Sequence, residues 1–211
     1  MKTPLLSFRL FPLALALLGG CAALPDKPLP VAVYDFGPVS AAAAPPAPTV
    51  AGLPVVLAEA DALAALDAVP VLYRLAYADV FELRPYAQAR WSMPPAHLVR
   101  QRLRTRLEQD RPVFEAGQAP VAQLKLELEE FSQVFDAPDR SRALVRLRAT
   151  LIPPAAAGGR GAERRLPVHQ VFSAERPAPS ADAGGGVRAL TAASDAAVDA
   201  LAQWLGRQNL R

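Results

Sequence analysis

Residues 121–135 carry the clearest alternation of hydrophobic and polar positions in the chain. Three leucines of one parity alternate with three charged residues of the other: Leu124, Leu126 and Leu128 against Lys125, Glu127 and Glu129. Successive side chains of a β-strand point to opposite faces, so this alternation predicts a strand with one buried and one solvated face. The pattern loses phase at Glu130-Phe131, which predicts a bulge or a strand end there.

Residues 142–152 repeat this pattern with basic residues in place of acidic ones. Val145, Leu147, Ala149 and Leu151 form one face, and Arg146, Arg148 and Thr150 form the other. Antiparallel pairing of the two segments sets the arginines against the glutamates, and each such pair contributes about 0.2–1 kcal/mol. The acidic row could instead be a catalytic or cation site, but the neighbouring basic strand accounts for it.

Five shorter segments have strand composition, being short, partly β-branched and bounded by turn residues. They are Val31–Phe36, Leu53–Glu59, Val71–Ala76, Val80–Leu83 and Val168–Glu175, with a turn at Tyr77-Ala78-Asp79 between the third and the fourth. Three stretches rich in alanine, proline or glycine are predicted loops: Ala41–Pro48, Pro153–Gly161 and Pro177–Gly186.

The first predicted helix spans His97–Gln109 and follows Pro94-Pro95, since proline is tolerated around the first turn of a helix. Its buried edge consists of Val99, Leu103 and Leu107, spaced four residues apart. Four arginines occupy much of the remaining surface: Arg100, Arg102, Arg104 and Arg106. They form either a solvated face paired with nearby acids or a contact with a membrane surface.

The second predicted helix spans Val187–Leu205 and stops at Gly206, a residue type that commonly ends helices. Its apolar stripe comprises Leu190, Ala197, Val198, Leu201, Trp204 and Leu205. The stripe is expected to pack on the core. Trp204, near the end of the helix, could alternatively make an oligomer contact.

The amino-terminal region has the layout of a secretory signal. Lys2 and Arg9 precede an apolar run at Leu10–Leu18, and Gly19-Gly20-Cys21 follows it. The run is too short to span a bilayer, which requires about 20 apolar residues. Two small residues directly before a cysteine match a bacterial lipobox; the alternative is an ordinary signal peptide with a chance cysteine.

The lipobox predicts residues 1–20 as a signal peptide that is cleaved after Gly20. Cys21 then carries a diacylglyceryl group and an N-acyl chain, which together anchor the protein stably. Ala22 follows the cysteine instead of aspartate, and by the bacterial sorting rule this favours the outer membrane, facing the periplasm. Residues 21–30 form a proline-rich tether, whose last nine residues reach about 28 Å in polyproline II.

Cleavage also removes Lys2 and Arg9 and no acid, so the mature chain has 21 basic and 20 acidic residues. The absence of a basic excess argues against a nucleic-acid partner. Residues 31–211 are long enough for one domain with its own core. The predicted architecture is therefore a mixed α/β domain, with a mainly antiparallel sheet packed by two main helices, on an N-terminal lipid tether.

The sequence shows no recognisable catalytic, metal or cofactor chemistry. His97 and His169 are the only histidines, and neither lies in a nucleophile or metal motif. The only cysteine is the predicted lipidation site, so thiolate ligands and disulfides are excluded. Gly184–Gly186 lacks the Lys-Ser/Thr of phosphate-binding loops. We therefore expect a protein that is not an enzyme and binds no cofactor beyond its covalent lipid.

Three segments together resemble the ABC-type transport auxiliary lipoprotein family, which includes the PqiC-like lipoproteins. They are Tyr73-Arg74, the run from Tyr86 to Pro95 (YAQARWSMPP) with the helix after it, and the closing run Ala197–Leu205 (AVDALAQWL). The resemblance covers most of residues 30–206, and its most specific part is Tyr-Ala-x-x-x-Trp-x-x-Pro-Pro.

The resemblance implies an outer-membrane accessory of an intermembrane lipid transport system. Its partners would be an MCE-domain protein crossing the periplasm and an inner-membrane ABC permease with its ATPase. The lipoprotein would dock the far end of the MCE assembly, and a matching homo-oligomeric ring would suit such a partner. Four residues are expected to contribute a docking surface, unless the two rings belong to the core: Tyr86, Trp91, Pro94 and Pro95.

Two other functional interpretations remain open at the level of sequence. The chain could be a structural lipoprotein of another envelope assembly, such as a lipopolysaccharide-export or secretion complex. It could also bind lipid within the domain itself, which would require an apolar cavity.

Overall fold

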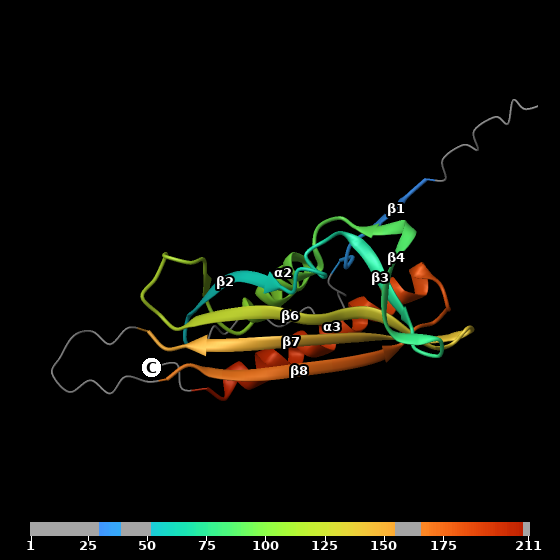
Figure 1. Cartoon of the computed structure of the whole chain (residues 1–211). Coiled ribbons are helices and arrows are strands. Elements are labelled where there is room, and N and C mark those ends of the chain that lie inside the picture. The colour runs from blue at the N-terminus through green and yellow to red at the C-terminus, as the bar shows by residue number, and fades with distance from the viewer. Residues whose placement is uncertain (1–29, 39–51, 155–165, 209–211) are drawn as a thin grey trace, which may run out of the picture. The chain divides into compact units, whose positions relative to one another are not determined.

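The computed structural model describes residues 30–38, 52–154 and 166–208 of the chain. Contacts within the chain separate Met1–Pro30 from Val31–Arg211, and the second unit is the folded domain. Its elements follow in this order (Figure 1): β1 (Ala32–Tyr34), β2 (Val55–Ala62), β3 (Pro70–Leu75), β4 (Asp79–Trp91), α2 (Pro95–Leu107), β5 (Val113–Phe114), β6 (Gln123–Ala137), β7 (Arg140–Ile152), β8 (Val168–Pro177) and α3 (Ala183–Gly206). The predicted mixed α/β class is confirmed.

Several sequence predictions lie outside the described residues. They are the signal peptide at residues 1–20, the lipidated Cys21, the tether apart from Pro30, the loop at 41–48, and the loop at 153–161 apart from its first two residues.

In the described part of the chain, eight strands form one sheet, and β6 is its central strand. One edge of β6 pairs antiparallel with β7, which in turn pairs antiparallel with β8. The other edge is shared between two parallel neighbours, since β2 pairs with the first half of β6 and β3 with the second half. β3 continues to β4 and β1, while β2 continues to β5, so the sheet forks at β6.

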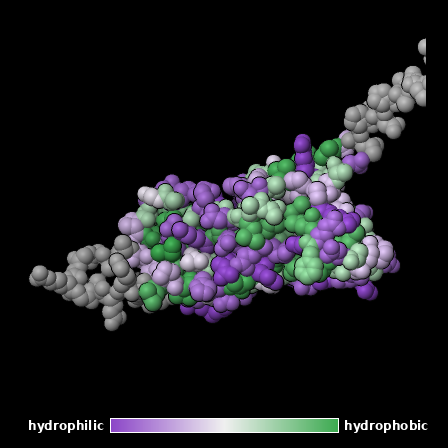
Figure 2. Space-filling view, in the orientation of Figure 1, coloured by the Kyte–Doolittle hydropathy of each residue, from purple (hydrophilic) through white to green (hydrophobic). Residues whose placement is uncertain are grey.

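The predicted pairing of the acidic and basic rows is confirmed. Glu127 lies opposite Arg148 in the antiparallel ladder, and Glu130 lies opposite Arg146. The register shifts at Glu129, one residue before the predicted break. Arg148 lies 2.5 Å from a carboxylate oxygen of Glu129 and 3.8 Å from one of Glu127. These charges cover the helix-free face of the sheet, where Figure 2 shows a broad hydrophilic surface.

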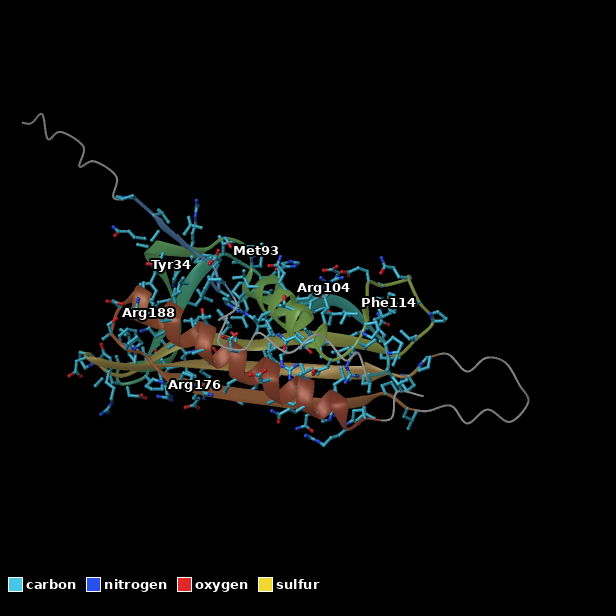
Figure 3. All side chains as sticks on the ribbon, turned by 180° about the vertical axis from the view of Figure 1, so that it is seen from behind. Tyr34, Met93, Arg104, Phe114, Arg176 and Arg188 are labelled. Carbon is cyan, nitrogen blue, oxygen red and sulfur yellow. The ribbon has the colours of Figure 1, made fainter. Side chains whose placement is uncertain are left out.

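Both described helices pack on the other face of the sheet, α2 over β2 and β6 and α3 over β7 and β8 (Figures 1 and 3). The predicted stripe of α2 is buried, including Val99 and Leu103. The stripe of α3 is buried as well. Trp204 packs edge-on against Phe172, with ring centroids 5.8 Å apart, so it belongs to the core of this domain.

The glycine run that reads as a loop is instead the first turn of α3. The helix begins at Ala183, and the Asp182 carboxylate caps it by accepting a hydrogen bond of 2.6 Å from the N–H of Gly185. That bond holds the pKa of Asp182 below its usual value. A Cβ atom at Gly186 would lie 2.0 Å from Oε1 of the buried Gln133. Gly186 therefore permits close packing of the helix on β6.

Strand β4 is much longer than predicted, because the segment from Pro85 to Trp91 continues the strand at Val80–Leu83. Proline removes a backbone donor, so alternation and composition alone argue against a strand there. β4 tolerates Pro85 because β1 joins it only at Ala89, which leaves most of β4 with β3 as its single described neighbour.

Candidate docking surface

Two of the four predicted docking residues are buried. Trp91 is 1% exposed, and its ring packs against Phe36 and Phe131 with centroid distances of 5.6 and 5.5 Å. Pro95 is buried at the first position of α2, while Pro94 is partly exposed. The sequence analysis left open that the two aromatic rings belong to the core, and this is the case for Trp91. A docking surface on the described domain cannot include Trp91 or Pro95.

Tyr86 is half-buried and anchored at its hydroxyl. It donates a hydrogen bond of 2.9 Å to Oε1 of Gln133, whose Nε2 donates to Oγ of Ser141 at 2.7 Å. Its ring lies against Tyr73, with centroids 4.5 Å apart. Burial raises the pKa of Tyr86 above its ordinary value, so the hydroxyl stays protonated as a donor. This arrangement positions β4 against β3 and β6, and it leaves only part of the ring for an external contact.

A group of exposed hydrophobic side chains lies instead at the turn between β3 and β4, at the opposite end of β4 from Trp91. Phe81 is 90% exposed, Val80 49% and Tyr77 48%. We call these three residues the hairpin patch. Figure 2 shows hydrophobic residues at the surface toward the β3–β4 end of the domain, among polar ones.

Polar contacts fix the backbone of the hairpin patch. The Asp79 carboxylate accepts a hydrogen bond of 2.8 Å from the N–H of Phe81, which is a local turn contact typical of aspartate. The Arg74 guanidinium donates to the carbonyl oxygens of Val80 and Phe81, each at 3.4 Å, and lies 3.5 Å from Glu130. The exposed side chains are thus presented on an ordered turn.

The sequence analysis places Val80 at a strand start and does not identify Phe81 as exposed. Strict alternation predicts one outward and one inward side chain for two successive residues. The register between β3 and β4 shifts after Arg74, which releases this pair from the alternation. The only feature of the sequence that marks this site is a Val-Phe pair directly after a Tyr-Ala-Asp turn. Such a pair does not show whether its side chains are buried or exposed.

The arginines of α2 are occupied by partners within the domain. Arg100 and Arg104 both bind Glu115, and Arg106 lies 2.7 Å from Asp110 and 2.9 Å from Asp199. Arg102 lies 3.2 Å from Asp195. The interpretation of a face paired with nearby acids is therefore confirmed, and the arrangement gives no support to a membrane contact through these arginines.

The described residues contain no cluster of three or more His, Cys, Asp or Glu side chains that could hold a metal ion. His97 and His169 are both exposed on the domain. No helix in the described ranges has both the length and the apolar character needed to cross a bilayer.

Solved structures with a similar fold carry little sequence similarity to this chain. The crystal structure of protein XCC0632 from Xanthomonas campestris aligns with a TM-score of 0.63 at 18% identity, over 83% of this chain and 91% of that one. The crystal structure of an uncharacterized protein aligns with a TM-score of 0.61 at 10% identity, over 83% and 99%. Both likenesses concern the fold, and no curated protein matches the sequence.

A family model assigns the chain to a protein family, which the similar solved structures do not do. The model of the ABC-type transport auxiliary lipoprotein component matches residues 34–202, which is most of the described domain and includes all three segments that carry the resemblance, apart from the last three residues. This is a family of transport auxiliary components and of lipoproteins, which have a membrane-anchored place in the cell envelope. The chain belongs to the ABC-type transport auxiliary lipoprotein component family.

Proposed function

We propose that this chain is the outer-membrane lipoprotein accessory of an ABC/MCE-type intermembrane lipid transport system. In this role it faces the periplasm and docks the distal end of an MCE-domain protein, whose ABC permease and ATPase lie in the inner membrane. The observation that carries the proposal is the family match over residues 34–202. The match supports an auxiliary role in ABC-type transport. That the cargo is lipid and the partner an MCE-domain protein is our inference.

The anchor in this proposal is Cys21, carrying a diacylglyceryl group and an N-acyl chain. Two or more acyl chains hold a protein on a membrane stably, whereas one chain does so only marginally. The following tether gives the domain a search radius of about 28 Å, taken as nine residues of polyproline II. An anchored domain with this reach meets a partner at a raised effective concentration.

The hairpin patch supports a protein partner as the docking target. Exposed aromatic side chains with a polar surround are typical of the centres of protein interfaces. The patch has such a surround, because Asp79 and Glu82 flank Phe81, and Arg84 pairs with Glu82.

The proposal is tested by a gentle detergent pull-down of the tagged full-length chain from its native membranes, with partners identified by mass spectrometry. We expect recovery of an MCE-domain protein with its permease and ATPase. The Phe81→Ser variant is expected to lose most of that recovery. Val168→Ser, which changes an exposed apolar residue on β8, is the matched control and is expected to retain it.

Recovery of a lipopolysaccharide-export or secretion complex, with MCE proteins present in the lysate and absent from the eluate, would refute the lipid-transport role. The structural-lipoprotein alternative would then be correct. Equal recovery by the Phe81→Ser and wild-type chains would remove the hairpin patch from the interface and leave the transport role intact.

A further inference from the structure

Strand β1 is an edge strand, and its outer side has no strand partner among the described residues. The N–H of Ser92 donates to the carbonyl oxygen of Tyr34 at 2.7 Å, so the carbonyl of Tyr34 faces β4. Successive residues of a strand direct their backbone polar groups to opposite sides. The N–H and C=O of Val33 therefore face away from β4. Val33 is also 54% exposed.

A groove of about 460 Å³ lies between this segment and the first half of α3. One wall is the chain from Val33 to Gly37, and the other wall carries Val187, Thr191 and Asp195 at successive turns of the helix. The segment wall is held in place by Arg102, which donates to the carbonyl oxygens of Phe36 at 2.5 Å and Gly37 at 3.3 Å. The groove is thus bounded by a strand edge and a helix.

The two ends of the groove have opposite charge. Arg188 stands at the end near the start of α3, where Figure 3 shows it close to Tyr34. Its guanidinium donates to Oγ of Ser180 at 3.3 Å, and in the described ranges it has no carboxylate within salt-bridge distance. Asp195 stands two turns further along, about 10 Å away at 1.5 Å per helical residue. Its side chain is 46% exposed beside Arg102.

We propose that this groove binds an extended segment of a partner protein, which adds to β1 as a further strand and places an acidic residue at Arg188 and a basic residue at Asp195. A strand rises about 3.3 Å per residue, so the two charges of the ligand lie about three to four positions apart. Main-chain bonds to Val33 supply affinity, and the charged ends supply direction and specificity. The proposal rests on the proposed docking function and names a contact for it.

Other occupants fit the groove less well. An acyl chain would shield the backbone groups of Val33 and the Arg188 guanidinium from water without offering either of them a hydrogen-bond partner, which is unfavourable. The segment at residues 41–48 of the same chain (AAAAPPAP) has no charge, and its three prolines have no N–H to donate. A separate polypeptide with both charges offers partners to the Val33 backbone and to Arg188.

The first test is photo-crosslinking in native membranes with p-benzoylphenylalanine in place of Val33, in the full-length tagged chain. The control carries the same residue in place of Val168, which has a similar exposure but lies on β8. The expected result is a crosslink from the first position only, mapped to an extended segment with an acid and a base three to four positions apart. No crosslink, or a crosslink to the chain's own residues 41–48, overturns the proposal.

The second test uses the mapped segment as a blocked synthetic peptide and measures its affinity for the chain by fluorescence anisotropy. Arg188→Glu is expected to weaken binding at least tenfold, and a peptide with lysine in place of its acid is expected to restore it. Arg176→Glu, an exposed arginine on β8 (Figure 3), is the control and should leave the affinity unchanged. N-methylation should abolish binding only at the peptide residue whose N–H donates to the carbonyl oxygen of Val33. Equal sensitivity at every residue, or none, overturns strand addition.

The two proposals fail separately. A crosslinked segment that belongs to a different envelope complex, with the same charge spacing, supports the groove and refutes the lipid-transport role. Recovery of the transport partners without any crosslink from position 33 retains that role and refutes the groove.

Discussion

Strand β4 carries an aromatic residue near each of its ends, and the two have opposite environments. Trp91 is enclosed by Phe36 and Phe131, where β1 pairs with the strand. Phe81 is 90% exposed, where β4 has β3 as its only described neighbour. Tyr86 lies between them and is half-buried. The comparison teaches that one strand can hold an aromatic side chain in the core at one end and expose another at its other end, and that the neighbouring elements decide which environment each side chain has.

Trp91→Ala should have the largest effect on stability, because it leaves a cavity beside Phe36 and Phe131. Replacing a buried tryptophan by alanine costs about 3–5 kcal/mol of unfolding free energy. Urea denaturation followed by circular dichroism measures this change. Trp91→Phe is the control, since it keeps an aromatic ring and removes an indole N–H that is buried without a partner among the described atoms. A loss below 1 kcal/mol for the alanine variant would contradict the assignment of this end to the core.

Gly186→Ala tests the packing next to Tyr86, midway along β4, where α3 meets Gln133. The added Cβ would lie 2.0 Å from Oε1 of Gln133, an atom that Tyr86 already holds. Overpacking of this kind costs about 1–3 kcal/mol. Gly184→Ala, whose Cβ would meet its nearest atom at 3.5 Å, should instead be neutral or up to about 1 kcal/mol more stable. Thermal and urea unfolding of the two variants measure their stabilities. Equal stabilities would refute the close approach of Gly186 to Gln133.

Tyr86→Phe removes the hydrogen bond to Gln133 and keeps the ring on Tyr73. Loss of this bond costs about 1–3 kcal/mol, because it leaves the buried Gln133 oxygen unpaired. The expected shift in the urea midpoint is therefore smaller than for Trp91→Ala and comparable to that for Gly186→Ala. Unchanged stability would mean that water replaces the tyrosine hydroxyl at this site.

Phe81→Ser should have the smallest effect on stability, within about 0.5 kcal/mol, because the side chain has little packing to lose. Its effect belongs to recognition, where we expect loss of the partner in the pull-down. A destabilisation above 1 kcal/mol would show that Phe81 is buried in the folded protein and would remove the contrast with Trp91.

Much of the fold can be predicted from the sequence, because the elements with two-sided patterns are unambiguous. The leucine rows of β6 and β7 and their facing charges predict both strands and their pairing, and the apolar stripes predict both helices. The bulge at Glu129 follows from a break in the same pattern. In each case the information is local and depends on one periodicity.

The environment of single residues depends on contacts that periodicity does not encode. The run from Tyr86 to Pro95 identifies the family, yet burial of Trp91 follows from Phe36, a residue far away in the sequence. The glycines at the start of α3 read as a loop because composition does not reveal the buried Gln133 beneath Gly186. Exposure of Phe81 follows from a register shift between two strands. All three depend on tertiary context.

The forked sheet also has a kinetic consequence. β6, β7, β8 and α3 are consecutive in the chain, whereas β2 and β3 reach β6 through parallel pairings over long sequence separations. Such non-local parallel pairings form late, because loop closure costs entropy before the contacts stabilise it. We therefore expect the carboxyl-terminal half to gain protection first in pulse-labelled hydrogen exchange, with β2 and β3 joining last. A domain built this way completes its folding in its amino-terminal half.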